Sequence, residues 1–485
     1  MSKKHSAKHQ ATTPAPRVST IALAILVVAL IALDASLGLS IFHAQSKAGA
    51  TKQATTSENP LSAQTNPRSD KANAISNKSA AKTTAEQTDA SIPESNEPPD
   101  SQSEERTKAG QETEPEPEPE PVKVEPASIE VMMIGDVLMH DELVDSGYRG
   151  DGSYDFGFLF DHITDYIGAA DLRMLNQESV MGEPERGYHL VVGEVGPIMN
   201  TPTALADTEA TYGFNLILNA HNHVLDLGYS GLAYEMDYWK AAYPQIPVIG
   251  VNNPHATADD SSQDYVNNVY VYEHDGLKVG VLNYTWWTND LFDNESSHQY
   301  VSYLSAEKVR SDVEKARAAG AEMLIACPHW GVQYDTEPSE EELTYARLFC
   351  DLGVDVIFGN HPHILQPVEV LTNDEGHRTV CFYSMGNFVA AGGMETNTLM
   401  GGVARATLQR HEDGTYGVSA ASLVPTVICY TVGPHMSAYP LSEWTYELAA
   451  ESYRSALTPD YAYAFLRDLL GSGFNEATGI YTVEL

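Results

Sequence analysis

The chain has 485 residues, enough for one large domain or two ordinary ones. Its 28 Lys and Arg are outnumbered by 67 Asp and Glu, which gives a formal net charge of -39. This balance argues against nucleic acid as a partner, and a polyanionic partner would need a bound cation or a local basic patch to offset the repulsion. The four cysteines form no Cys-x-x-Cys pair and several lie in apolar runs, which favours buried free thiols over disulfides.

The amino terminus predicts a membrane anchor. Residues 1–17 carry three lysines and one arginine, and a mainly apolar run follows over 18–42. About 20 apolar residues cross a bilayer, and basic residues before such a run predict that this end is cytoplasmic. We therefore expect a cytoplasmic basic segment over 1–17 and a transmembrane signal anchor over 18–42. A cleaved signal peptide is the alternative, because Ala44 and Ala48 are residues that a signal protease accepts. Both interpretations predict a C-terminal domain outside the cytoplasm, and the anchor predicts a single-pass protein of the cell membrane.

Residues 43–127 predict a disordered linker. They consist mainly of Ser, Thr, Ala, Asn, Lys, Glu and Pro, with almost no large apolar side chains to offset the entropy of ordering. Glu and Pro alternate from Glu114 to Pro121, a pattern typical of an extended, self-repelling spacer. We expect this segment to hold a folded domain away from the membrane or through a wall.

The sequence from residue 128 predicts a folded α/β domain. Short apolar runs typical of buried strands alternate with amphipathic segments typical of helices. The expected strands cover 129–134, 171–175, 214–218, 248–251, 277–282, 323–326, 354–358 and 379–384. Two helices are expected over 305–319 and 339–353, the second opening with the capping-box spacing of Ser339 and Glu342. This alternation favours an α/β sheet covered on its faces. Partly helical spacing after about residue 437 predicts a C-terminal helical extension over 431–485.

Polar side chains of the same kinds follow five of the expected strands. The set comprises Asp136, Glu178, Asn222 with His223, His329, and His361 with His363. Imidazole and oxygen donors suit divalent transition metals such as Mn, Zn or Fe. Open α/β sheets bind ligands at the C-terminal ends of their strands, so we expect these groups to meet. A carboxylate can bridge two cations, so the set predicts a two-metal centre able to activate water and polarise a phosphoryl or carbonyl oxygen.

Three members of this set give the strongest individual signals. His361 and His363 flank a proline, and an extended His-x-His backbone would point both rings to the same side. Glu178 ends an apolar strand, where a buried carboxylate is unfavourable without a partner. Each residue alone also has an ordinary interpretation as a turn or loop residue. The prediction of a metal site rests on their occurrence together.

The motifs around these residues resemble a known family. In chain order they are Gly135-Asp136-Val137, Asn176-Gln177-Glu178, Asn222-His223 with Asp226 and Gly228, His329-Trp330-Gly331, Gly359-Asn360-His361-Pro362-His363 with Gln366-Pro367, and Tyr383-Ser384-Met385-Gly386-Asn387-Phe388. This order resembles the CapA-type poly-γ-glutamate capsule biosynthesis family, which is related to the calcineurin-like metallophosphoesterases. The resemblance covers about 128–423 and implies a four-layer α/β/β/α sandwich, which we place over 128–430.

The resemblance also implies roles for individual residues. The candidate metal ligands, for two divalent ions, are Asp136, Glu178, Asn222, His329, His361 and His363. His223 would be the acid that protonates a leaving group, with Asp226 as its orienting partner. The metal identity, Mn, Zn or Fe, stays open.

The chain departs from the family pattern at several positions. Gln177 stands where the family usually has Leu, His221 where it often has Asn, and Gln333 where it often has an acid. The Asp-x-His of true phosphoesterases is absent, because Val137 and Leu138 follow Asp136. These differences make full two-metal occupancy, and therefore catalysis, an open question.

Two functions follow, with a degenerate scaffold as a third possibility. In one, the chain is a membrane-anchored component that assists synthesis or export of an anionic capsule polymer, poly-γ-glutamate, together with other capsule-synthesis membrane proteins. In the other, it is an active phosphoesterase or amidase acting on a cell-envelope substrate. Trp286, Trp287 and Trp330 could line a cleft or pack in the core. Asn387 and Gln366 could hydrogen-bond a ligand.

Overall fold

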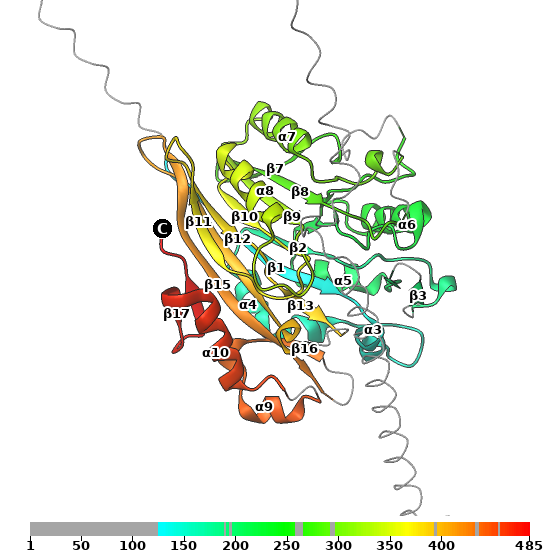
Figure 1. Cartoon of the computed structure of the whole chain (residues 1–485). Coiled ribbons are helices and arrows are strands. Elements are labelled where there is room, and N and C mark those ends of the chain that lie inside the picture. Colours follow the sequence, from blue (N-terminus) through cyan, green and yellow to red (C-terminus); the bar gives the residue numbers. More distant parts are fainter. Residues whose placement is uncertain are drawn as a thin grey trace, which may run out of the picture. The chain divides into compact units, whose positions relative to one another are not determined.

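A computed structural model describes residues 125–188, 191–193, 196–257, 265–291, 296–391, 395–431, 436–453 and 456–485. The chain divides into two units, Met1–Thr113 and Glu114–Leu485, and all described residues belong to the second (Figure 1). The predicted anchor at 18–42 and nearly all of the predicted linker at 43–127 lie outside the described residues. Among the residues that are described, no helix is long and apolar enough to span a membrane.

The larger of the two main sheets has ten strands and joins a parallel half to an antiparallel half. Its order is β17-β18-β15-β14-β1-β2-β5-β6, with β13 also pairing with β1 and β16 with β15. The parallel strands are β1 (Ala127–Leu138), β2 (Leu172–Asn176), β5 (Leu216–Leu218), β6 (Val248–Ile249) and β13 (Asn387–Ala390). The antiparallel ones are β14 (Met400–Arg410), β15 (Tyr416–Tyr430), β16 (Met436–Pro440), β17 (Phe474–Asn475) and β18 (Ile480–Thr482).

The second sheet has six strands in the order β11-β12-β10-β9-β8-β7. They are β7 (Tyr270–His274), β8 (Leu277–Thr285), β9 (Met323–His329), β10 (Val356–Phe358), β11 (Val368–Thr372) and β12 (Arg378–Phe382), and a separate hairpin joins β3 (Val191–Gly193) to β4 (Gly196–Ile198). Strand β9 is buried on both faces. Met323 and Ile325 belong to the core shared with the ten-stranded sheet, whereas Leu324 and Ala326 belong to a second core under two helices.

Helices pack against both sheets. They are α3 (Asp141–Gly147), α4 (Thr164–Gly168), α5 (Ala204–Thr211), α6 (Gly228–Ala242), α7 (Ala306–Ala318), α8 (Glu340–Asp351), α9 (Tyr446–Glu451) and α10 (Pro459–Leu470). Short 3-10 helices cover Gly157–Leu159, Asp161–Ile163, Pro184–Arg186, Ser297–Gln299, Thr396–Leu399, Leu441–Glu443 and Gly471–Gly473. Helices α7 and α8 cover the outer face of the six-stranded sheet, because their buried side chains share its second core. Ser305 caps α7 and the Ser339–Glu342 capping box opens α8, as the sequence predicts.

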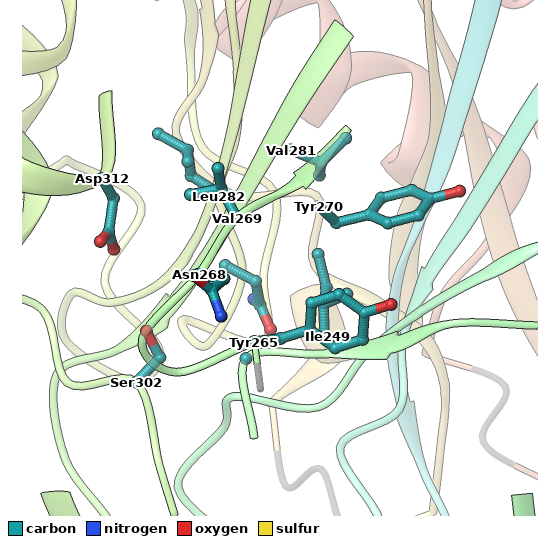
Figure 2. A pocket seen from close by; sticks show the side chains of 11 residues that line it. Ile249, Tyr265, Asn268, Val269, Tyr270, Val281, Leu282, Ser302 and Asp312 are labelled. Atoms are coloured by element: carbon teal, nitrogen blue, oxygen red, sulfur yellow. The ribbon is translucent and has the colours of Figure 1, made fainter. Parts of the chain in front are cut away.

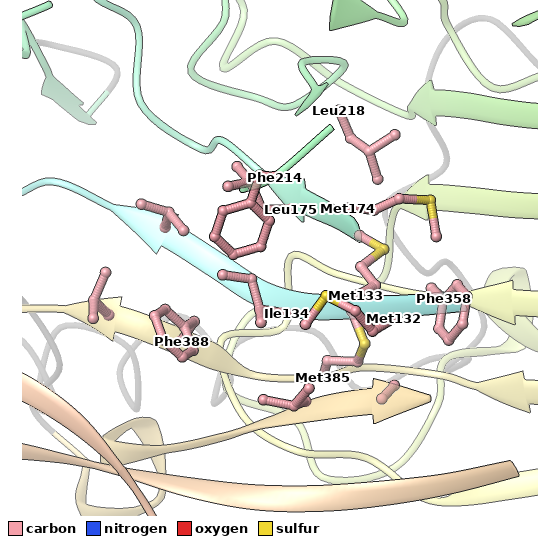
Figure 3. Close-up of a cluster of buried hydrophobic side chains, with 14 of the residues drawn as sticks. Met132, Met133, Ile134, Met174, Leu175, Phe214, Leu218, Phe358, Met385 and Phe388 are labelled. Carbon is pink, nitrogen blue, oxygen red and sulfur yellow. The ribbon is translucent and has the colours of Figure 1, made fainter. Parts of the chain in front are cut away.

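The two sheets share one apolar core (Figure 3). Met132 and Met133 of β1 and Met174 of β2 lie there with Phe358 of β10. Side chains from the two sheets therefore fill a common interior, which brings the C-terminal ends of β1, β2 and β5 close to those of β9 and β10. The prediction of a mixed α/β fold is confirmed.

The structure differs from the predicted elements at both ends of the domain. Strand β1 does not end at Asp136 but continues to Leu138, with a register irregularity between Asp136 and Val137. At the other end, 431–485 holds strands as well as helices. Strands β16 and β18 pair with β15, so this segment extends the ten-stranded sheet instead of forming a purely helical extension.

Candidate metal centre

Both sheets deliver side chains to one buried site. Asp136 lies at the irregularity in β1, and Glu178 and Asn222 follow β2 and β5 of the same sheet. His329 is the last residue of β9, and His361 and His363 follow β10, so the imidazoles come from the other sheet. All six predicted ligands are buried, none more than 4% exposed. The structure therefore brings the predicted set together at the seam between the two sheets.

The ligand atoms form two overlapping groups. Asp136, Glu178 and His363, which we call the oxygen-rich triad, each offer an atom within 4.8 Å of the others. Glu178, His329 and His361, the imidazole-rich triad, do the same. Glu178 belongs to both triads. A carboxylate in this position can contact two cations, as a two-metal site requires.

Glu178 has the environment expected of a metal ligand. Among the described residues, neither of its carboxylate oxygens has a hydrogen-bond partner, although the side chain is 0% exposed. His329 Nε2 lies 3.5 Å from Oε1, and His363 Nδ1 lies 3.7 Å from Oε2. The pKa of Glu178 is raised to about 8, mainly by burial and in part by the neighbouring Asp136, against the opposing effect of His363. A buried carboxylate without partners is costly, and a bound cation would remove that cost. The residues present thus fit a divalent metal.

Asp136 and His363 form an ion pair within the oxygen-rich triad. Asp136 Oδ2 lies 3.2 Å from His363 Nδ1, and Asp136 Oδ1 accepts a hydrogen bond of 2.8 Å from Asn176 Nδ2. Burial raises the pKa of Asp136, but the hydrogen bond and charge of His363 outweigh it and hold this pKa below its ordinary value. Burial lowers the pKa of His363, yet Glu178 and Asp136 together raise it above its ordinary value.

The imidazole-rich triad contains two neutral histidines. Burial lowers the pKa of His329 to about 4 and that of His361 well below its ordinary value. His361 Nδ1 lies 3.1 Å and Asn222 Oδ1 2.7 Å from His329 Nε2. Neutral imidazoles are the form that binds metal, so these two rings need not release a proton before a cation enters. Asn222 supplies a further oxygen beside the triad.

The backbone of the His361-Pro362-His363 segment contradicts the predicted extended conformation. His361 has φ 99° and His363 has φ 61°, both in the left-handed region. The two rings nevertheless approach each other, with centroids 5.8 Å apart. Tyr334 and Asn289, also at φ > 0, contact the same site. Strained backbone of this kind concentrates at functional sites because the surrounding packing holds side chains where local preference would not.

His223 and Asp226 form the predicted pair beside the triads. His223 Nδ1 lies 2.9 Å from Asp226 Oδ2, and this oxygen also accepts a hydrogen bond from the Met199 backbone N–H. Asn289 lies between this pair and Asn222, accepting from Asn222 Nδ2 at 3.1 Å. The Asn289 side chain therefore links the His223 ring to Asn222, beside the imidazole-rich triad. The pairing holds the ring by Nδ1 and leaves Nε2 for a ligand.

Two departures from the family pattern belong to one buried network. Gln177 Nε2 and Asn219 Nδ2 both donate to Glu235 Oε1 on α6, at 2.5 and 3.0 Å. Asn219 Oδ1 lies 2.9 Å from His221 Nε2, and His221 Nδ1 accepts from the His223 backbone N–H. The network therefore ties the loop that carries Glu178 to the loop that carries Asn222 and His223.

Sequence reasoning did not assign roles to Asn176 or Asn289, and it named Asn387 only as a possible hydrogen-bonding residue. Asn176 is the first residue of the Asn176-Gln177-Glu178 motif, so its position two residues before Glu178 could have indicated a role at the site. Trp330 is a core residue whose indole donates to the Tyr383 carbonyl oxygen, and Trp286 is the tryptophan that approaches the site, 6.3 Å from the His361 ring. Gln366 donates to the carbonyl oxygens of Asp335 and Glu337 and holds that loop in place.

A small cavity lies beside strand β8 (Figure 2). It has a volume of about 10 Å³, space for one water, and is lined by polar side chains that include Asn268, Asn283, Ser302 and Asp312. None of the predicted metal ligands lines it.

These features define a mixed α/β protein with a buried cluster of carboxylate and imidazole groups suited to divalent cations. The family described as "Bacterial capsule synthesis protein PGA_cap" matches residues 130–391, more than half of the chain, and the protein belongs to this family. The resemblance deduced from the motifs is therefore confirmed.

Two curated relatives agree with this assignment. The chain is 27% identical over 273 residues to "Capsule biosynthesis protein CapA" of Bacillus anthracis, covering 55% of this chain and 60% of that protein. It is 27% identical over 206 residues to "PGA biosynthesis protein CapA" of Bacillus subtilis (strain 168), covering 42% of this chain and 50% of that one. The matches thus span only part of each relative.

Solved structures show more distant likeness. A calcineurin-like phosphoesterase, YfkN from Bacillus subtilis, matches at 12% identity and a TM-score of 0.35, covering 71% of this chain and 97% of that chain. A putative 5'-nucleotidase from Staphylococcus aureus matches at 16% identity and a TM-score of 0.39, covering 65% and 54%. Similarity at this level carries no argument about the chemistry of this chain.

Proposed function

We propose that this capsule-synthesis family member carries a two-metal centre that hydrolyses a phosphoester or an amide of a cell-envelope polymer. One observation carries the proposal: the buried Glu178, whose oxygens accept no hydrogen bond from the described residues, is shared by two triads of ligand atoms. We also propose, as expected from the sequence, that the domain is a four-layer sandwich and lies outside the cytoplasm. The segment 18–42 would anchor it in the membrane, where it would join other capsule-synthesis membrane proteins.

Each ion would have its own set of protein ligands. Asp136, Glu178 and His363 would hold one ion, and Glu178, Asn222, His329 and His361 the other. Bound divalent cations lower the pKa of water and polarise a phosphoryl or carbonyl oxygen. The identity of the metal, Mn, Zn or Fe, stays open, because the donor atoms accept each of them.

His223 would give a proton to the leaving group. Asp226 Oδ2 holds His223 Nδ1 at 2.9 Å, which fixes the orientation of the ring that would act as the acid. The Met199 backbone N–H, bound to the same oxygen, keeps the carboxylate in place. The chain thus supplies an oriented acid next to the ions.

A second candidate function is assembly or export of the polymer without turnover. The charges around the site support this candidate. Asp136 and Glu178 are neighbours, and the other principal charged groups around them are histidines. The chain as a whole carries a net charge of -39. Carboxylates of a poly-γ-glutamate chain would therefore have to bind through the bound cations. In this role the same centre captures the polymer and does not cleave it.

Turnover by the purified full-length chain separates the two functions. We expect the chain loaded with Mn²⁺, Zn²⁺ or Fe²⁺ to hydrolyse bis(p-nitrophenyl) phosphate or a γ-glutamyl amide. The His223→Ala variant should keep its metal content and lose turnover by about 10²-fold or more, the usual contribution of a general acid. The control is His255→Ala, which removes an exposed histidine held by Asp237 in the same Nδ1–carboxylate geometry at 2.8 Å.

The outcomes are distinct. Turnover that falls in His223→Ala but not in His255→Ala supports the hydrolase. Metal binding with no turnover in any preparation contradicts the hydrolase and favours the assembly role. Turnover that is unchanged in His223→Ala contradicts the assignment of the acid.

A further inference from the structure

The two triads are unequally supplied with neighbouring oxygens. Asn222 Oδ1 stands beside the imidazole-rich triad, 2.7 Å from His329 Nε2. The oxygen-rich triad lacks the histidine of an Asp-x-His motif, because Val137 and Leu138 follow Asp136. A cation there would have three protein ligands from the triad itself, which leaves room for a fourth from a neighbouring strand.

Asn387 is the cross-strand neighbour of Asp136. It is the first residue of β13, which runs parallel to β1, and the two residues are register partners. Gly135 makes this pairing possible, because a Cβ there would lie 2.1 Å from the Gly386 carbonyl oxygen. The same oxygen accepts a hydrogen bond from the Asp136 N–H. The Asn387 side chain is 2% exposed.

Distances around His363 fit a shared cation. His363 Nδ1 lies 3.1 Å from Asn387 Oδ1, 3.2 Å from Asp136 Oδ2 and 3.7 Å from Glu178 Oε2. One N–H can point well at only one oxygen, so hydrogen bonding alone leaves the other two unexplained. Neighbouring ligands on a cation at about 2.1 Å lie roughly 3.0 Å apart in an octahedron and 3.4 Å apart in a tetrahedron. The spacings to Asn387 and Asp136 fall within that range, and the spacing to Glu178 is 0.3 Å longer than its upper end.

The amide of Asn387 is oriented for this role. Its Nδ2 donates to the Thr398 carbonyl oxygen at 3.0 Å, and a carbonyl oxygen can only accept. This bond sets Nδ2 away from the triad and turns Oδ1 toward it. His363 is held from its far side by the Gln333 side chain, 3.3 Å from Nε2, which leaves Nδ1 as its ligand atom.

We propose that Asn387 Oδ1 is the fourth protein ligand of the ion in the oxygen-rich triad. The inference rests on the proposed metal centre and adds a residue to it. Each ion would then have one carboxamide oxygen, from Asn222 on one side and Asn387 on the other. Asn387 would replace the missing histidine, and its place next to Asp136 is set by the pairing of β13 with β1.

Metal titration of the full-length chain with Mn²⁺ and with Zn²⁺ tests the proposal through affinity and stoichiometry, without any assay of turnover. Asn387→Leu keeps the side-chain volume and removes the oxygen, whereas Asn387→Asp keeps an oxygen at that position. Ser384→Ala is the matched control, because Ser384 makes two hydrogen bonds within the same motif, to the Ile364 carbonyl oxygen and from the Gly386 N–H. Thermal unfolding in chelator measures the structural cost of each change separately.

We expect one of the two ions to bind about 10- to 100-fold more weakly in Asn387→Leu. This is the usual effect of removing a residue that supports a metal ligand, and removing a ligand itself should cost no less. Asn387→Asp should retain both ions with a changed affinity for one of them, and Ser384→Ala should bind both as the unmodified chain does. Two ions bound with unchanged affinity in Asn387→Leu would overturn the assignment. If Asn387→Leu does not fold, unchanged affinity for both ions in Asn387→Asp would overturn it equally. Failure of the unmodified chain to bind metal would instead refute the proposed centre itself, and the ligand assignment with it.

Discussion

The two halves of the candidate centre are built in different ways. The imidazole-rich triad takes His329 and His361 from the ends of two adjacent parallel strands, β9 and β10, and both rings are neutral. The oxygen-rich triad takes Asp136 from a register irregularity in β1 and His363 from a left-handed backbone position, and its members form an ion pair. Only Glu178 belongs to both.

Because of this difference, the two halves differ in whether a histidine must lose a proton before an ion binds. The two imidazoles of the imidazole-rich half are neutral and can bind a cation without losing a proton. In the oxygen-rich half a cation must displace the proton of His363, whose pKa is raised by Glu178 and Asp136 despite its burial. The comparison therefore predicts that the two ions can be removed independently, except by a change at Glu178.

The largest effect should come from Glu178→Gln. The change keeps the shape of the side chain but removes the charge shared by both triads, so the affinity for both ions should fall together. Metal analysis after dialysis at fixed free Mn²⁺ or Zn²⁺ measures this. Loss of only one ion would mean that Glu178 does not bridge and that the two halves are separate sites.

Single changes in each half should have about half that effect. We expect His363→Ala and His329→Ala each to lower the metal content from about two equivalents to about one, as in a centre with two separately held ions. The control variant His255→Ala changes an exposed histidine that belongs to neither triad, and it should keep both ions. The independence of the two halves fails if either variant loses both ions.

One pH-dependent contribution to stability should come from Glu342, which supports the imidazole-rich half. Glu342 packs against the Gly331 backbone, two residues after His329, and burial raises its pKa from 4.5 to about 7. A carboxyl with a raised pKa stabilises the folded state at low pH, and this stability is lost as the pH rises from 4.5 to about 7. At about 1.4 kcal/mol per pH unit, the loss is about 3 kcal/mol above that window.

Glu342→Gln should remove this part of the pH dependence, because glutamine does not ionise and can retain the capping box with Ser339. Denaturant unfolding at pH 5 and pH 8 of the metal-free protein gives the difference between the variant and the unmodified chain. Equal slopes with pH in the two proteins would show that Glu342 is ionised throughout.

The smallest expected effect is a difference in metal preference. With the two asparagines included, the oxygen-rich half offers three oxygens and one nitrogen, and the imidazole-rich half two of each. Oxygen donors favour Mn²⁺ and imidazoles favour Zn²⁺. The ratio of Zn²⁺ to Mn²⁺ affinity should therefore be higher in His363→Ala, which retains the imidazole-rich half, than in His329→Ala. Equal ratios would indicate that the halves are chemically equivalent.

Local sequence signals were enough for the elements whose causes are local. The cap at Ser305 and the capping box of Ser339 and Glu342 set the starts of α7 and α8, and apolar runs located the parallel strands other than β13. The long antiparallel pair β14 and β15 was not predicted, because its pairing with β1 joins residues far apart in sequence.

The same distinction holds within the site. The predicted ligands could be found because each follows an apolar strand, a local pattern. The conformation of His361 and His363 was predicted wrongly, since packing of the surrounding loop overrides the extended preference before and after proline. The place of Asn387 beside Asp136 depends on strand register, which a single sequence does not specify.

Metal analysis of the full-length chain and of its His361→Ala/His363→Ala double variant tests the central claim most directly. This pair removes one imidazole from each triad. We predict about two equivalents of a transition metal in the unmodified chain and fewer than about 0.2 in the variant, as a two-metal centre requires. Fewer than about 0.2 equivalents in both proteins, after reconstitution with Mn, Zn and Fe, would contradict the existence of the centre.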